Sequence, residues 1–362
     1  MATETTARTM TVATEAVALH GVAFDHGSAQ HDTRLDERLQ AGGLDRSLVF
    51  EVALVTEAAA IAAARLRGHG NEKAADKAAV DAMRRELSTM DITGTVVIGE
   101  GEMDEAPMLY IGEKLGTGRG PEIDIAVDPL EGTTICAKAM PNALAVLAIA
   151  EKGGFLHAPD MYMSKIAIGP GYPDGVVDLD ASAADNLHAL AKAKGVPVSR
   201  ITACILDRPR HAELIKAVRA TGASIQLIPD GDIAGVIWAT NPDETGIDIY
   251  MGSGGAPEGV LAAAALACTG GQIQGRLLPS NDEERVRAAA MGIADINRKL
   301  LLADMAHGDV MFAATGVTNG WLLAGVLFHG DDATTETMVL RSKCATVRRI
   351  KTTFRDVSRH FG

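Results

Sequence analysis

Apolar segments that end in carboxylate-rich turns are the feature that most restricts how this chain can fold. Val96–Ile98 is followed by Gly99–Glu102, and Ile125–Val127 is followed by Asp128–Gly132. Such short apolar runs, bounded by glycine, are typical of buried strands. Ligand sites in open α/β sheets lie beyond the carboxyl ends of strands, so these acids would meet at one edge if the strands are parallel neighbours.

Segments with helical spacing lie between the strands. Apolar residues recur at helical intervals over 48–67, which Gly68 and Gly70 close, and over about 76–90. Further strands are predicted over 144–149, 201–206, 224–228 and 248–250, and further helices over 212–221 and 260–268. This alternation predicts an α/β or α+β fold built of layers.

The sequence also indicates a division into segments. Residues 1–43 lack the basic and apolar regions of a secretory signal, and we expect a flexible N-terminal extension there. A change of composition near 195–199 predicts a first, metal-binding domain over 44–197. A second α/β domain over 198–362 would contribute substrate and metal contacts.

Composition excludes several classes of function. With a net charge of −13, the chain is unsuited to bind nucleic acid or an anionic membrane surface. No apolar run approaches the roughly 20 residues that a membrane-spanning helix needs. The four cysteines contain no Cys-x-x-Cys pair, which argues against zinc and against disulfides and favours the reduced cytoplasm.

The acids themselves indicate a metal. Clustered carboxylates repel one another unless a cation balances them, and Asp76, Asp230 and Glu258 would join those that follow the strands. Oxygen ligands without histidine or cysteine favour Mg²⁺ or Mn²⁺. Such ions polarise phosphoryl oxygens, acidify the attacking water and stabilise the leaving oxygen.

Phosphate binding is predicted at two places. The segment 132–134 has the features of a helix start, where free amides favour an anion, and the Thr133 hydroxyl is suited to orient a water molecule. Glu102 or a nearby acid would take the proton from that water. Arg208–His211 would hold a second phosphate. The basic residues Arg341, Lys343, Arg348 and Arg349 are interpreted as a solvated face without a site role.

The segment Asp128–Thr133 resembles the metal motif of the lithium-sensitive phosphatase superfamily. Within it, the chain is similar to class II, GlpX-type, fructose-1,6-bisphosphatase over about 48–350. The resemblance is carried by six ordered blocks, Val97–Glu102, Ala106–Tyr110, Ala158–Met163, Arg208–His211, Asp230–Asp232 and Gly254–Gly259.

The resemblance implies metal ligands at Asp76, Glu100, Asp128, Glu131 and Glu258. It implies substrate contacts at Glu131, Gly132, Thr133, Tyr162, Arg208, Pro209, Arg210, Asp230, Gly231, Asp232 and Gly255. Thr133, with Glu102 or Asp104, would manage the nucleophilic water. On residue type alone, Tyr162 reads as a core aromatic and Asp104 as part of a solvated helix start.

The family also implies a five-layered αβαβα sandwich, Mn²⁺ or Mg²⁺ dependence, and a homo-oligomer, either dimer or tetramer. Its reaction removes the 1-phosphate of fructose 1,6-bisphosphate to give fructose 6-phosphate in gluconeogenesis. The alternatives are a dual fructose and sedoheptulose bisphosphatase, an inositol-phosphate phosphatase, or a sugar-phosphate binder without activity. The chain departs from the family at Gly70–Lys73, where Gly-Asn-Glu-Lys replaces the usual Gly-Asp-Lys-Asn.

Overall fold

The computed structural model describes residues 44–101 and 108–361. Residues 1–43, which include the expected N-terminal extension, lie outside the described residues. The described helices are α2 Leu48–Ala64, α3 Glu72–Leu87, α4 Thr133–Ala137, α5 Ala183–Lys194, α6 Ala212–Ala220, α7 Asp232–Trp238, α8 Pro242–Thr245, α9 Ala256–Thr269, α10 Asp282–Ala290, α11 Leu302–Met305 and α12 Val357–Phe361, with 3-10 turns η1 Val198–Arg200 and η2 Pro209–His211.

The strands of the described part form a larger and a smaller sheet. The larger has the order β12-β13-β11-β4-β3-β1-β2, with β14 paired to β13, and the smaller has the order β10-β9-β5-β8-β6-β7. The strands of the larger sheet are β1 Thr93–Ile98, β2 Lys114–Leu115, β3 Glu122–Glu131, β4 Leu144–Glu151, β11 Val310–Gly316, β12 Leu327–His329, β13 Asp332–Arg341 and β14 Thr346–Phe354. Those of the smaller sheet are β5 Tyr162–Ile168, β6 Thr202–Leu206, β7 Ser224–Ile228, β8 Ile249–Gly255, β9 Gln272–Leu278 and β10 Leu300–Leu301.

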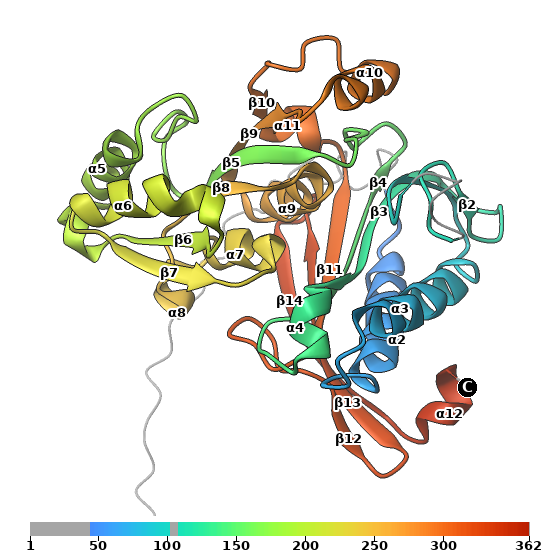
Figure 1. Ribbon diagram of the computed structural model, residues 1–362. Coiled ribbons are helices and arrows are strands. Elements are labelled where there is room, and N and C mark those ends of the chain that lie inside the picture. The colour runs from blue at the N-terminus through green and yellow to red at the C-terminus, as the bar shows by residue number, and fades with distance from the viewer. Residues whose placement is uncertain (1–43, 102–107, 362) are drawn as a thin grey trace, which may run out of the picture. The chain divides into compact units, whose positions relative to one another are not determined.

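Helices cover both faces of the larger sheet (Figure 1). Along β4, Leu144, Val146 and Ala148 pack into the core that contains α9, whereas the alternating Ala145, Leu147 and Ile149 pack into the core that contains α2 and α3. A strand buried on both faces needs apolar residues throughout, which explains the uninterrupted apolar run of β4.

The smaller sheet is covered in the same way. Its inner face shares the core with α7 and α9, and its outer face packs against α5 and α6. The sequence of layers is therefore α2 with α3, the larger sheet, α7 with α9, the smaller sheet, and α5 with α6. This arrangement confirms the predicted layered α/β class.

Strand directions decide where the acids can meet. β1 runs parallel to β3, and β6 runs parallel to β7 and β8. The other strand pairs of the described residues are antiparallel. Glu100, in the turn after β1, and Asp128 and Glu131 thus come from the larger sheet, and the acids after β7 and β8 come from the smaller sheet. Asp128 and Glu131 lie within β3 and not in a turn after it, because the strand continues past the predicted end at Val127 to Glu131. The expected single edge holds for β1 and β3, which are parallel neighbours, whereas β7 and β8 belong to the other sheet.

The departure at 70–73 has a local structural role. Asn71 is the N-cap of α3, and its side chain accepts a hydrogen bond from the Ala74 amide at 3.1 Å. This cap starts α3 at Glu72, four residues before the predicted start, and places Asp76 in the second turn of the helix.

Both sheets draw strands from either side of residue 197, since β5 precedes it and β11 follows it. The division of the chain at 197 and 198 stays a prediction. Among the described residues, no helix has the length and apolar character needed to cross a bilayer.

Candidate active site

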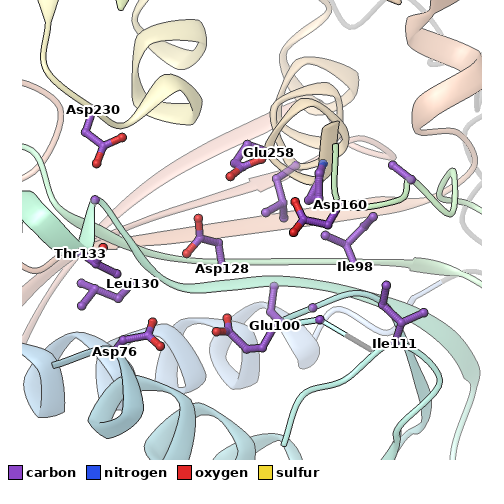
Figure 2. A pocket seen from close by; sticks show the side chains of 17 residues that line it. Asp76, Ile98, Glu100, Ile111, Asp128, Leu130, Thr133, Asp160, Asp230 and Glu258 are labelled. Atoms are coloured by element: carbon purple, nitrogen blue, oxygen red, sulfur yellow. The ribbon is translucent and has the colours of Figure 1, made fainter. Parts of the chain in front are cut away.

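A cavity of about 360 Å³ lies between the carboxyl ends of the parallel strands of the two sheets. Its acidic lining residues are Asp76, Glu100, Asp128, Asp160, Asp230 and Glu258. Asp76 comes from α3, Glu100 follows β1 and Asp128 lies in β3, whereas Asp230 follows β7 and Glu258 lies in the first turn of α9. Figure 2 shows Asp128 between the side chains of Asp76 and Glu100 on one side and that of Glu258 on the other.

The cavity carboxylates raise one another's pKa. Burial, with the charges of Asp76 and Glu258, raises the pKa of Glu100 to about 7. Burial also raises the pKa of Asp128 well above its ordinary value, and the charges of Glu258 and Glu100 add to this effect. For Glu258, burial and the charge of Asp232 raise the pKa to about 7. If these acids are ionised together, they repel one another, and a bound cation would relieve that repulsion.

Glu131 lies in the chain between Leu130 and Gly132, which line the cavity, and is only 4% exposed. Its Oε1 accepts a hydrogen bond from the Ile233 amide at 2.6 Å, whereas its Oε2 has no partner among the described residues. Glu258 Oε2 is likewise buried and unpartnered. Buried carboxylate oxygens normally have a partner, so these two fit an oxygen-coordinated cation such as Mg²⁺ or Mn²⁺.

The described residues do not form a ready-made metal cluster. No three of their His, Cys, Asp or Glu side chains are grouped closely enough to hold an ion as they stand. The carboxylates share the cavity without converging on one point. Without a cation, the ionised carboxylates repel one another and stay apart. A bound cation would have to draw them together.

Thr133 is the first residue of α4, at the edge of the cavity. The predicted helix start is therefore observed. Gly132 precedes it with φ of 82° and ψ of 54°, a left-handed conformation that glycine adopts readily. This turn carries the chain from the end of β3, where Glu131 lies, into the helix.

The basic segment after β6 lies beside Asp230 and Tyr162 rather than in the lining of the cavity. Arg208 forms an ion pair with Asp230 at 3.5 Å. Arg210 donates to the Ser253 carbonyl at 2.8 Å, and its guanidinium lies over the Tyr162 ring. Tyr162 is 50% exposed, so it is not the core aromatic that its residue type favoured.

His211 anchors this segment. Its Nδ1 lies 2.8 Å from the Leu206 carbonyl, and its Nε2 accepts from the Ser253 amide at 2.9 Å. The first contact therefore makes Nδ1 the protonated nitrogen. Burial lowers the pKa of His211 and favours this neutral form. Leu206 ends β6 and Ser253 lies in β8, so His211 fixes the position of Arg210 between two strands.

The predicted site residues fall into groups. Asp76, Glu100, Asp128, Gly132, Thr133, Asp230 and Glu258 line the cavity. Glu131, Gly231, Asp232, Gly255, Tyr162 and Arg208–Arg210 do not line it. Asp232 turns away into the interior, where it pairs with Lys165. Glu102 and Asp104 lie outside the described residues.

Sequence reasoning missed Asp160 and Lys165. Asp160 lines the cavity, and its charge contributes to raising the pKa of Glu258. Its position within the quoted block Ala158–Met163, between apolar residues, was the available signal. For Lys165 the signal was likewise a charged residue among apolar ones, in the segment that forms β5.

One residue of the predicted basic face is buried and not exposed. Arg341 is 4% exposed and pairs with the equally buried Asp309 at 3.1 Å. Arg348 is exposed, as predicted, and donates to Thr346 at 2.6 Å. Arg341 was assigned to the solvated face because it opens a run of basic residues over 341–349, but it ends β13 and is buried.

Comparison with known proteins identifies the family of the chain. The sequence model of the family described as bacterial fructose-1,6-bisphosphatase, glpX-encoded, matches residues 46–354. The chain is 49% identical over 320 residues to fructose-1,6-bisphosphatase 1 class 2 of Escherichia coli (strain K12), covering 84% of this chain and 94% of the relative. Proteins named fructose-1,6-bisphosphatase class 2 from Escherichia coli O6:H1 and Shigella flexneri match with the same identity and coverage.

Proposed function

Because the chain belongs to the family of bacterial, glpX-encoded fructose-1,6-bisphosphatases, we propose that it hydrolyses the 1-phosphate of fructose 1,6-bisphosphate to give fructose 6-phosphate and phosphate. It is a phosphoric monoester hydrolase that serves gluconeogenesis. The observation that carries the proposal is the cavity in which acids from both sheets raise one another's pKa. All of its lining residues lie within the residues 46–354 that the family model matches. The reaction adds one water molecule across the bond between phosphorus and the sugar oxygen.

We propose Asp76, Glu100, Asp128, Glu131 and Glu258 as the residues that hold a divalent cation, Mn²⁺ or Mg²⁺. The support is the oxygen-only donor set and the unpartnered buried oxygens of Glu131 and Glu258. A bound divalent ion supplies Lewis acidity toward the phosphoryl oxygens. Asp160, which lines the same cavity, belongs with this group by position.

Thr133 is proposed to orient the attacking water through its hydroxyl, and the amides of 132–134 to bind the transferred phosphate. The support is the position of Thr133 at the start of α4 and in the lining of the cavity. Glu102 or Asp104 would accept the proton from the water, by resemblance alone, since both lie outside the described residues.

The remaining substrate contacts are proposed for the smaller sheet. Tyr162, Arg208, Pro209 and Arg210 would hold the distal phosphate, because two guanidiniums at a helix start favour an anion nearby. Gly231 and Gly255, with Asp230, would face the sugar, whereas a sugar contact at Asp232 rests on the resemblance alone, because its carboxylate pairs with Lys165 in the interior. We also infer a homo-oligomer, dimer or tetramer, in the cytoplasm, where the four described cysteines would stay free.

The test uses the full chain, stripped of metal with a chelator and assayed for phosphate release from fructose 1,6-bisphosphate with Mn²⁺ or Mg²⁺. We expect release only with a divalent ion. Sedoheptulose bisphosphate and an inositol monophosphate are assayed in parallel. Their catalytic efficiencies, compared with that of fructose 1,6-bisphosphate, show which phosphate ester the enzyme prefers. No release from any of these esters would overturn the proposal and favour a non-catalytic binder, and a higher efficiency with another ester would reassign the substrate.

A further inference from the structure

Lys165 is a fully buried cation in the centre of the smaller sheet. It lies in β5, between Gly252 of β8 and Gly275 of β9, and is 2% exposed. Strand alternation places Lys165 on the same face as Met163 and Ala167, whose side chains pack into the core with α7 and α9. A lysine is rarely buried to this degree unless its charge is paired.

Two acceptors satisfy the Lys165 ammonium. Its Nζ forms an ion pair with Asp232 Oδ2 and donates to the Gly255 carbonyl at 2.8 Å. The Tyr250 hydroxyl donates to the same oxygen of Asp232 at 3.4 Å. Lys165 therefore joins the first residue of α7 to the turn between β8 and α9.

Glycines make room for this arrangement. A Cβ at Gly254 would lie 2.1 Å from Asp232 Oδ2 and 3.1 Å from Lys165 Nζ. One at Gly259 would lie 3.3 Å from Lys165 Cδ and 2.8 Å from the Met163 sulfur. At Gly254 the absence of a Cβ is thus required by the close approach of Asp232 and Lys165, whereas at Gly259 the tightest contact would be with Met163, and Lys165 would have to give only slightly.

Both acceptors of Lys165 lie next to groups that contact proposed metal ligands. Gly255 lies three residues before Glu258, and a Cβ at Gly255 would lie 1.8 Å from Glu258 Oε2, so the turn and this carboxylate are in close contact. Asp232 precedes Ile233, whose amide donates to Glu131 Oε1 at 2.6 Å. A displacement of Asp232 or Gly255 would therefore move the supports of Glu131 and Glu258.

We propose that Lys165 is a positioning residue, which holds Asp232 and the Gly255 carbonyl in place and thereby orients Glu131 and Glu258 for the divalent cation. The inference rests on the proposed function and deepens it, because it assigns the fixed geometry of two ligands to one buried side chain. Lys165 does not line the cavity, so it acts through its neighbours and not on the substrate.

The test replaces Lys165 by methionine, which keeps the aliphatic stem and removes the charge and the donor. Lys165→Met is expected to raise the Mn²⁺ dissociation constant about tenfold, the usual effect of losing a residue that supports metal ligands. The constant is measured by calorimetry on the metal-stripped full chain without substrate. In the assay, half-maximal activity should need about tenfold more Mn²⁺, while KM for the sugar bisphosphate at saturating Mn²⁺ stays within about threefold.

Lys299→Met is the matched control. Lys299 is another lysine that bridges acids, Asp178 at 2.6 Å and Asp180 at 3.0 Å, but these residues are away from the cavity lining. It should leave the Mn²⁺ dissociation constant unchanged. If Lys165→Met fails to fold, Tyr250→Phe takes its place, because it removes one donor to Asp232 without leaving a charge unpaired, and about a threefold weaker Mn²⁺ affinity is expected.

Unchanged or tighter Mn²⁺ binding in the folded Lys165→Met variant, or in Tyr250→Phe if it is the variant used, would overturn the inference. A rise in KM together with unchanged metal affinity would also overturn it. If the proposed function is wrong, the wild-type chain releases no phosphate. Calorimetry of Mn²⁺ binding does not depend on that activity, so it still decides the role of Lys165.

Discussion

The guanidinium of Arg210 lies over the ring of Tyr162, with its Cζ 4.8 Å from the ring centroid. The two residues come from η2 and from the start of β5, which are far apart in the sequence. This contact holds an exposed arginine in one place before any ligand arrives, and a preorganised side chain loses less entropy on binding.

Replacing Tyr162 by leucine should therefore weaken binding of the distal phosphate. We expect Tyr162→Leu to raise KM for fructose 1,6-bisphosphate about threefold to tenfold, because an exposed cation–π contact and a direct hydroxyl contact are both lost. Tyr162→Phe keeps the ring and should show a smaller increase. Steady-state kinetics at saturating Mn²⁺ measure both, and equal KM values in the two variants would contradict a role for the ring.

Glu258 should control metal affinity. Glu258→Gln removes a charged oxygen that has no other partner among the described residues, so Mn²⁺ should bind at least about tenfold more weakly. Calorimetry on the metal-stripped chain gives the constant. Glu283→Gln makes the same change in the first turn of α10, on an exposed side chain, and should leave Mn²⁺ binding as in the wild type. Wild-type affinity in Glu258→Gln would remove this residue from the ligand set.

Thr133 should affect turnover more than folding. We expect Thr133→Ala to lower kcat about 100-fold, because the water loses its orienting hydroxyl, with Tm within about 2 °C of the wild type. Thr133→Ser retains a hydroxyl and should recover most of the activity. Stopped assays and thermal melting test this, and an alanine variant with normal kcat would show that Thr133 only starts the helix.

Stability of the metal-free protein should fall as pH rises. Burial raises the pKa of Glu100 and of Glu258 to about 7, above the ordinary value of 4.5. The folded chain then binds more protons than the unfolded chain between these values, so stability is full below about 4.5 and is lost as pH rises through about 7. Melting of the chelator-treated chain should show Tm lower by roughly 5 °C at pH 8 than at pH 5.5.

Mn²⁺ should offset the loss of stability at high pH, because the cation replaces the protons between the carboxylates. With excess Mn²⁺, Tm at pH 8 should exceed the metal-free value at the same pH. A Tm of the metal-free chain that rises from pH 5.5 to pH 8 would contradict the crowding of ionisable acids in the cavity.

Arg341 should matter for stability and not for catalysis. Besides Asp309, its guanidinium donates to the Leu44 carbonyl, and Asp309 accepts from the Leu44 amide at 3.0 Å. Arg341→Met leaves Asp309 buried without its cation, and we expect a loss of about 3–5 kcal/mol in the free energy of unfolding. Denaturant titration measures the loss. Arg348→Met removes an exposed neighbour and should cost under about 1 kcal/mol, with kcat unchanged in both variants.

Part of the secondary structure around the cavity was predictable from the sequence because its patterns are local, although β5 and α7 were not predicted. The runs that became β1, β3, β4, β6 and β7 are continuously apolar or end in glycine-rich turns, and α9 has helical spacing. β13 and β14 were not predicted. They form a hairpin with β14 mostly exposed, so polar residues interrupt the apolar pattern and the basic residues resemble a solvated loop.

The site was predictable for residues that directly follow strands, such as Glu100 and Asp230. Asp160 and Lys165 were missed because their roles depend on packing between layers that are distant in the sequence. Local spacing carries no information on which buried charge finds a partner across a sheet. The orientation of Asp232 toward the interior has the same origin, since only tertiary structure brings Lys165 beside it.

The two sheets contribute different parts of the cavity. Asp76, Glu100, Asp128 and Thr133 come from the larger sheet and its helices, whereas Asp230 and Glu258 follow strands of the smaller sheet. Tyr162, Arg208 and Arg210 lie outside the lining, on the smaller sheet and the segment after β6. The proposed metal ligands are thus divided between the layers, since Glu258 follows β8 of the smaller sheet while Asp76, Glu100 and Asp128 belong to the larger one. A change of sugar preference through Tyr162, Arg208 or Arg210 would therefore have to leave the turn between β8 and α9 in place, or the cation would lose part of its coordination.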